Sequence, residues 1–293
     1  MGGKPWRLAG QLENVHCFVG IGFGLNTDKE NKGKHIYAGV AHVFDRFGSW
    51  IDIASGSQQL SDLEFESFDG TQKYLQGTDS FKISEVLTQG IVYNALRLYQ
   101  QNQTQTREPP QNIVIHKLGP VFECEVLGIL EGVRQILGTL ERCNIGIVQI
   151  EQEHQVRLYG LHSEEDRLDR TVPRGIGLII NKQKIALAST GSSQRGSKTY
   201  YIGIGTPQPL IITSILPSPS ILTKYGLQSE QFYSTLSLTR HIMALTQLHW
   251  GSIRDNIRLP ITAMYAQKVA DLISKTKATN LNTWASFHRL WFL

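Results

Sequence analysis

The stretch from residue 112 to residue 150 constrains the fold most, because its pattern alternates strand, helix and strand. Asn112–His116 (NIVIH) is a short, continuously apolar run, typical of a parallel strand that is covered on both faces. Val121–Leu137 carries apolar residues at helical spacing, and Ile145–Ile150 (IGIVQI) is strand-like again. Such a unit predicts two parallel strands with the connecting helix on one face of the sheet.

Three β-rich stretches precede this unit. Val15–Gly24 predicts a buried strand, and His35–Phe44 and Ser49–Ala54 predict two antiparallel strands joined by a turn at Asp45–Gly48. Antiparallel strands followed by a parallel unit predict an α/β protein with a mixed central sheet flanked by helices. That order of elements is compatible with a ribonuclease-H-like architecture.

The rest of the chain adds helices and strands to this plan. A helix is expected over Ile83–Leu98, and Ser229 is expected to cap another. Further strands are expected at Pro173–Ile180, Lys184–Ala188, Thr199–Gly205 and Gln208–Ile215. The last helix is expected to carry Pro260 in its first turn, with an apolar stripe at Ala266, Val269, Ala270 and Ile273.

Composition excludes several classes of protein. A chain of 293 residues with 41% hydrophobic and 18% charged residues can bury a large core and is not of the disordered class. No apolar run is long enough to span a membrane, and the N-terminus lacks the apolar segment of a signal peptide. Cys17, Cys124 and Cys143 stand in no metal-ligand spacing and fit a reducing compartment. We therefore expect a soluble, cytoplasmic protein.

The net charge of +4 is unevenly distributed along the chain. Residues 170–293 hold 14 Lys and Arg against 3 acidic residues, a net charge of +11, whereas residues 1–169 carry a net charge of −7. Halves of opposite sign indicate a surface for a polyanion on the C-terminal half. Pairing between the two halves, or an acidic partner protein, would account for the same distribution.

Two glycine-rich stretches resemble nucleotide-binding loops but fail their patterns. Gly20–Leu25 lacks the last glycine of the dinucleotide fingerprint, and no helix pattern follows it. Gly191–Thr199 is one residue too long for a Walker loop and precedes a strand pattern, so we expect a basic hairpin there.

Five segments, in order along the chain, resemble the Piwi domain of Argonaute proteins. Gly2–Arg7 resembles the "GG-x-PW" entry from the preceding MID domain, and Phe18–Gly22 resembles the first strand, "IG-x-D". Ile115–Gly119 resembles "HRDG", and Tyr200–Leu210 resembles the "GT-x-x-P" strand that approaches bound nucleic acid. Pro260–Ala270 resembles "P-x-x-YAH-x-VA" near the C-terminus. The resemblance covers essentially the whole chain, as one Piwi domain over 1–293 without a MID domain.

The departures from this pattern fall on the positions that hold metal in the family. The resemblance puts Gly22 and Leu118 where two catalytic Asp residues belong, and Gln267 where a His or Asp belongs. The fourth ligand, a loop Glu, has Glu64 and Glu66 as candidates. Two-metal phosphodiester cleavage needs several carboxylate or imidazole ligands, so we expect no catalysis. We expect Gly22, Leu118 and Gln267 to surround an empty catalytic pocket at the ends of strands and a helix.

Blank sites of this kind are similar to those of the short, catalytically inactive prokaryotic Argonautes. The resemblance implies a guide RNA or DNA, a complementary DNA target and a role against invading DNA. It also implies a MID domain or partner subunit, and an effector protein of the Sir2-like, TIR or nuclease type. In this reading the chain binds nucleic acid, directed by the guide, and leaves cleavage to another protein.

The basic residues of the C-terminal half are the candidate nucleic-acid contacts, because phosphate contacts give affinity without reading bases. They are Arg174, Lys182, Lys184, Arg195, Lys198, Arg258 and Lys268. The resemblance further implies a Mg²⁺ ion at the 5′ phosphate of the guide, held by the C-terminal carboxylate of Leu293. We expect the apolar tail at Trp284–Leu293 to be anchored in the protein.

Two alternatives remain open at the level of sequence. The first is an active, metal-dependent nuclease of the ribonuclease-H class with a non-standard ligand set, drawn from Asp28, Asp45, Asp52 and Glu66. The second is a structural subunit whose basic face binds an acidic protein.

Overall fold

The computed structural model describes ten stretches of the chain. They are residues 7–12, 14–27, 34–56, 83–103, 108–159, 172–191, 193–195, 198–200, 208–248 and 258–276. Predictions that concern Asp28, Glu64, Glu66, the tail at 284–293 and most of the strand expected at Thr199–Gly205 lie outside these residues.

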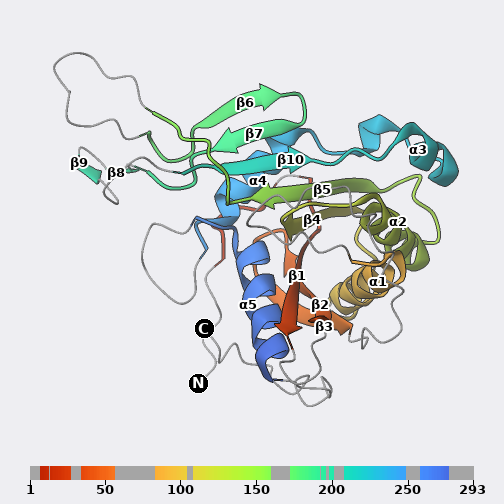
Figure 1. The fold of residues 1–293 in the computed structure, drawn as a ribbon. Coiled ribbons are helices and arrows are strands. Elements are labelled where there is room, and N and C mark those ends of the chain that lie inside the picture. The colour runs from red at the N-terminus through yellow and green to blue at the C-terminus, as the bar shows by residue number, and fades with distance from the viewer. Residues whose placement is uncertain are drawn as a thin grey trace, which may run out of the picture.

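An eight-stranded mixed sheet forms the centre of the protein (Figure 1). In order across the sheet its strands are β3 (Trp50–Gly56), β2 (Lys34–Asp45), β1 (Cys17–Thr27), β4 (Asn112–Leu118), β5 (Asn144–Glu151), β10 (Leu210–Ser214), β7 (Lys184–Leu187) and β6 (Gly177–Asn181). The central strands β1, β4 and β5 are parallel, and all the outer pairings are antiparallel. The predicted α/β class and the antiparallel pairing of the second and third strands are confirmed.

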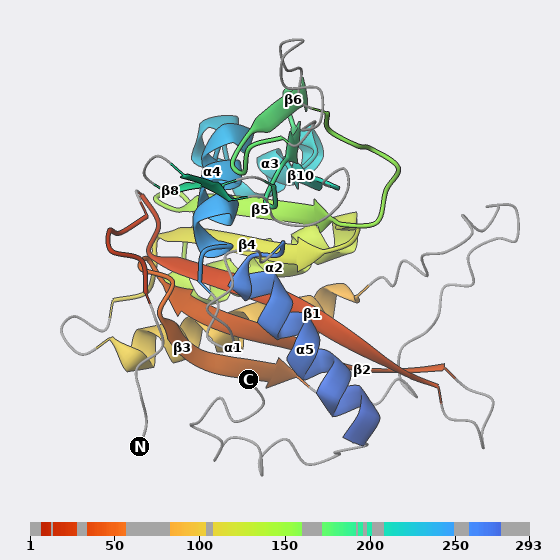
Figure 2. The ribbon, with the colours of Figure 1, turned by 90° about the vertical axis from the view of Figure 1, so that its left-hand side faces the viewer.

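Helices cover both faces of this sheet. On one face lie α1 (Glu85–Asn102) and α2 (Glu123–Leu137), and on the other lie α4 (Thr235–Leu245) and α5 (Ile261–Thr276) (Figures 1 and 2). Alternate residues of a strand point to opposite faces, so Val19 and Ile21 pack toward α1 and α2 while Phe18 packs toward α4 and α5. The near-continuous apolar run of β4 follows from this double cover, because it needs apolar residues on both faces.

Two boundaries differ from the sequence predictions, each for a local reason. Ser229 does not cap the fourth helix: it opens a short 3₁₀ turn, η3 (Ser229–Gln231), and the cap is Ser234, whose Oγ accepts from the Ser237 N–H at 3.2 Å. The strand expected from Pro173 starts only at Gly177, because Gly175 takes a φ of +93° in the preceding turn. A helix that the sequence reading missed, α3 (Pro219–Tyr225), has Pro219 at its first position.

A separate two-stranded hairpin joins β8 (Ser193–Arg195) and β9 (Lys198–Tyr200), as expected for the basic stretch after Gly191. Within the described ranges, none of the helices combines the length and the apolar character that crossing a membrane requires.

Candidate catalytic centre and basic surfaces

Glycines on β1 bring the backbone of α5 into direct contact with the sheet. A methyl carbon placed on Gly20 would lie 3.1 Å from the Cα of Thr262, and closer still to the Thr262 carbonyl group. The same test at Gly22 gives 2.7 Å to the backbone nitrogen of Gln267, and less to the carbonyl group of Ala266. Ordinary contacts of a Cβ atom begin at 3.4 Å. Only residues without a side chain fit at these two positions, and we call Gly20 and Gly22 together the glycine track.

Leu118 and Gln267 flank this track. Ile21 and Lys117 are partners in the parallel pairing of β1 with β4, so Gly22 and Leu118 are the next residues along adjacent strands. Leu118 packs against the core on the α4 and α5 side. The Gln267 side chain donates from Nε2 to Oδ1 of Asp271, one turn further along α5, at 2.7 Å.

The structure therefore brings the three candidate positions into one region, but Gly22 does not lie at the end of a strand as expected. Gly22 lies in the middle of β1 rather than at its end, and the backbone of α5 fills the space beside it. The physical reason is the pair of glycines on one face of the strand, which lets the helix approach until backbone meets backbone.

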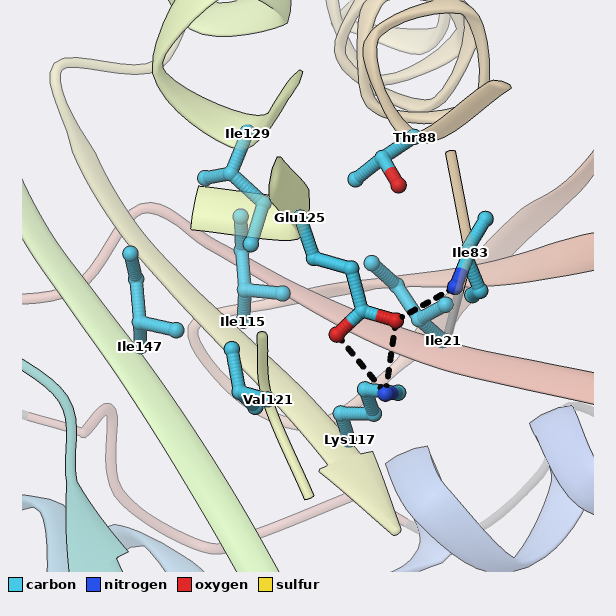
Figure 3. Close-up of a pocket in the computed structure, with 9 residues that line it drawn as sticks. All are labelled: Ile21, Ile83, Thr88, Ile115, Lys117, Val121, Glu125, Ile129 and Ile147. Atoms are coloured by element: carbon cyan, nitrogen blue, oxygen red, sulfur yellow. Dashed lines mark hydrogen bonds and ion pairs between the residues drawn. The ribbon is translucent and has the colours of Figure 1, made fainter. Parts of the chain in front are cut away.

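A buried ion pair lies beside Leu118, on the opposite face of the sheet. Lys117 donates from Nζ to both carboxylate oxygens of Glu125, at 2.8 and 2.7 Å (Figure 3). The same Nζ also donates to the carbonyl of Pro120. Glu125 also accepts from the backbone N–H groups of Ile83, at 2.9 Å, and of Phe122, at 3.0 Å. Burial lowers the pKa of Lys117, and the Glu125 carboxylate opposes this shift only in part. The pair fastens the end of β4 to the first turn of α2.

A histidine from the "HRDG"-like segment contacts the first turn of α5. His116 shares a hydrogen bond of 2.7 Å between its Nδ1 and Oγ1 of Thr262. Burial lowers the pKa of His116 to about 3, and the nearby His241 adds to the shift. His42, on β2, is fully buried and has its pKa lowered to about 3 by burial alone. Burial therefore keeps both imidazole rings neutral near pH 7, and the hydrogen bond of His116 connects β4 to the first turn of α5.

Two of the candidate phosphate contacts are used within the fold. Arg258 donates from Nη2 to the carbonyl groups of Gln152 and Pro209, the latter at 3.2 Å. Arg174 donates from Nη2 to the backbone oxygen and Oγ1 of Thr246, at 3.2 and 2.9 Å. Both guanidinium groups therefore connect segments that are distant in sequence. This is a structural role that does not depend on any contact with a phosphate.

Two lysines of the β6–β7 hairpin are better placed for a polyanion. Lys182 is exposed in the turn. Lys184 is partly exposed and lies 3.7 Å from a carboxylate oxygen of Glu151, a contact too long and too solvated to hold it firmly. On α5, Lys268 is exposed and its Nζ lies 5.5 Å from the centre of the Tyr265 ring.

Arg195 and Lys198 are paired with each other in the antiparallel pairing of β8 with β9. Their side chains are outside the description, so only their backbone neighbourhood is established. Leu293 lies outside the described residues altogether, and the Mg²⁺ expected there stays a prediction.

The alternative metal ligands receive little support from the described residues. Asp45 accepts from the backbone N–H groups of Phe47 and Ser49, both at 2.8 Å, so it shapes the β2–β3 turn. Asp52 lies on β3 with an undescribed side chain. Among the residues whose positions are described, no three His, Cys, Asp or Glu side chains gather in a group able to hold a metal ion.

Sequence reasoning missed both the glycine track and the buried ion pair. The signal for the first was present, since glycines at alternate positions of a strand mark a close backbone approach. The signal for the second was a lysine inside an apolar strand, eight residues before a glutamate in the first turn of a helix.

Comparison with known proteins agrees with this geometry. The sequence matches the Piwi domain family over residues 1–277. The chain therefore belongs to the Piwi domain family. The structure is similar to that of an Aquifex aeolicus Argonaute, with a TM-score of 0.55 and 16% sequence identity, over 94% of this chain and 30% of that one.

A second structure, of the Aquifex protein with externally bound siRNA, matches with the same TM-score and identity over 91% of this chain and 29% of that one. No curated protein matches the sequence. The predicted ribonuclease-H-like, Piwi-type fold is confirmed. The chain spans about 30% of the length of these Argonautes, so their full activity does not transfer with the fold.

Proposed function

We propose that this chain is a guide-directed nucleic-acid-binding Piwi module that does not cleave its target. The observation that carries the proposal is the contact between Gly22 and the backbone of α5, at the position where the family resemblance expects the first catalytic Asp. Two-metal cleavage needs carboxylates that converge on the scissile phosphate. A carboxylate cannot be accommodated beside Gly22 without moving the helix.

The neighbouring positions support the same proposal. Leu118 offers no metal ligand and packs with apolar core residues. Gln267 is a neutral amide engaged with Asp271. Asp271, the partner of that amide, lies one turn further along α5.

The basic C-terminal half supports binding of a polyanion. Lys182 and Lys184 belong to one hairpin, and Arg195 and Lys198 belong to another. Both hairpins lie within the stretch from Arg170 to Ser229, which has no acidic residue. Phosphate contacts of this kind hold nucleic acid without regard to sequence, which leaves sequence selection to a guide strand.

The biological setting that we propose is a prokaryotic Argonaute system that acts on invading DNA. In it a MID domain or partner subunit holds the 5′ end of a guide RNA or DNA, and an effector of the Sir2-like, TIR or nuclease type supplies the response. The siRNA named with the Aquifex structure supports nucleic acid as the ligand class. A Mg²⁺ ion held by the Leu293 carboxylate at the guide 5′ phosphate belongs to the same proposal.

Binding is tested by titrating labelled single-stranded and duplex DNA and RNA at several salt concentrations. Replacing Lys182, Lys184, Arg195 and Lys198 with Ala should weaken binding similarly for all sequences. Each lost phosphate contact should lower the slope of log affinity against log salt by about 0.7–0.9. Arg97→Ala, which removes an exposed cation from α1 near the far edge of the sheet, is the matched control and should leave the slope unchanged.

Cleavage is tested on the same labelled strands with Mg²⁺ or Mn²⁺. We expect none, with or without a guide. Metal-dependent cleavage that is lost when Asp28, Asp45, Asp52 or Glu66 is replaced by its amide would instead favour the alternative nuclease with a non-standard ligand set. Absence of salt-dependent binding to DNA and RNA, combined with binding of an acidic protein, would favour the structural subunit.

A further inference from the structure

The strand at the outer edge of the sheet, β6, exposes a run of aliphatic side chains. Ile176, Leu178, Ile179 and Ile180 keep 47%, 55%, 67% and 46% of their surface exposed. Across the described residues, nine large hydrophobic side chains are exposed, and four of them fall in this stretch of five residues. Single exposed apolar residues are ordinary, whereas a contiguous group marks a surface that another molecule covers.

The geometry of β6 shows what kind of contact the group can make. β6 ends the sheet and pairs with β7 on its inner side, and no described strand pairs with its outer side (Figure 1). Leu178 lies opposite Ala186 and Ile179 opposite Ile185. Because alternate residues point to opposite faces, aliphatic surface lies above and below the same open edge. An added strand would gain main-chain hydrogen bonds and apolar contacts on both faces.

The charge around β6 indicates the chemistry of such a strand. From Arg170 to Ser229 the chain has seven basic residues and no acidic one. Lys182 follows directly after β6 and is exposed, and no described carboxylate lies within ion-pair distance of it. An acidic segment would therefore be attracted to this edge. A second copy of the chain would bring two such basic stretches together, which opposes pairing of β6 with itself.

We propose that β6 receives an extended, acidic segment of a partner protein, which continues the sheet as a further strand. The interaction concerns a protein partner at the sheet edge, and it does not rest on nucleic-acid binding or on the absence of cleavage. The partner's alternate side chains would be apolar where they meet Leu178 and Ile179, and acidic toward Lys182.

The test uses a blocked synthetic peptide of alternating glutamate and valine, labelled for fluorescence anisotropy. We expect it to bind and to protect the amides of β6 from hydrogen exchange, while a lysine–valine peptide of equal length does not. Ile179→Asp should weaken binding about tenfold or more, since it removes one large apolar contact and adds repulsion. Val86→Asp on α1 is the matched control, because Val86 has the same 67% exposure, and it should have no effect.

The proposal is overturned by any of three results. These are absence of peptide binding, equal binding of the lysine–valine peptide, or binding that Ile179→Asp leaves unchanged. Self-association in sedimentation experiments that Ile179→Asp abolishes would assign the edge to a second copy, and it would also overturn the proposal. Peptide binding is measured in the absence of nucleic acid, so failure here and failure of the proposed function are distinguishable.

Discussion

The contact between Gly22 and α5 leads to a prediction about the position that the family resemblance assigns to the first catalytic Asp. Gly22→Ala adds a single carbon, which would lie 2.7 Å from the Gln267 nitrogen and closer to the Ala266 carbonyl group. Ordinary contact begins at 3.4 Å, so α5 would have to move by about 0.7 Å at Gln267 and further at Ala266. The obstacle is backbone, which cannot rotate away as a side chain can.

Overpacking of this kind typically costs about 1–3 kcal/mol of unfolding free energy. In a chain of this size, each kcal/mol lowers the melting temperature by about 2–4 °C. We therefore expect Gly22→Ala to melt several degrees below the parent protein in calorimetry. The matched control is Gly90→Ala on α1, where an added carbon meets nothing within 4 Å. That change should stabilise the protein by about 0.5–1 kcal/mol, because alanine favours the helix.

The same reasoning extends to catalysis. Gly22→Asp combined with Leu118→Asp restores two carboxylates in sequence but not the space for a metal, so we expect neither Mn²⁺ binding in calorimetric titration nor cleavage. Equal melting temperatures for Gly22→Ala and the parent protein would refute the argument. So would Mn²⁺ binding by the double variant, since both results would mean that α5 yields at little cost.

Three further predictions follow from other parts of the molecule. Burial lowers the pKa of His42 and of His116 from 6.5 to about 3 in the folded protein. As the pH falls below about 6.5, these two histidines bind protons in the unfolded chain but not in the folded one. The free energy of unfolding should therefore decrease as the pH drops from about 6.5 toward 3. At pH 5 the loss should be about 2 kcal/mol for each ring, and urea unfolding at pH 7.5 and 5 would measure it, with a pH-independent midpoint as the contrary result. Lys117→Met should cost about 3–5 kcal/mol of unfolding free energy, because it leaves the Glu125 carboxylate buried without its cation. Adding Glu125→Gln should recover part of that loss in denaturant melts, because the amide is neutral and its oxygen still accepts from a backbone N–H group. Equal stability of the single and double variants would contradict this. Two glycines added after Leu293 should reduce the preference for 5′-phosphorylated over 5′-hydroxyl guides when a MID domain is present, and an unchanged preference would remove the carboxylate from the site.

The sequence by itself determined the class of fold. Strand–helix–strand periodicity over residues 112–150 predicted the parallel core, and the stretches around the turn at Asp45–Gly48 predicted the antiparallel pair, because local patterns report which faces must be buried. The resemblance to the family also led to the prediction that Gly22, Leu118 and Gln267 stand at its metal positions, and that assignment stays a prediction. The sequence predicted the starts of helices less well. Ser229 and Ser234 are equally suitable N-cap residues, and only the packing of the folded chain decides that Ser234 caps α4.

Only the tertiary structure decided what those side chains do. Gly22 and Gln267 are far apart in sequence, and no local pattern states that helix backbone fills the space between them. Arg174 and Arg258 look like phosphate contacts in sequence, yet their guanidinium groups bind carbonyl oxygens of distant segments. The aliphatic run of β6 reads as a buried strand, and it is exposed because the order of strands leaves it at the edge. The periodicity of the sequence indicates which residues favour burial. The elements that pack around them in three dimensions determine whether the chain itself buries those residues.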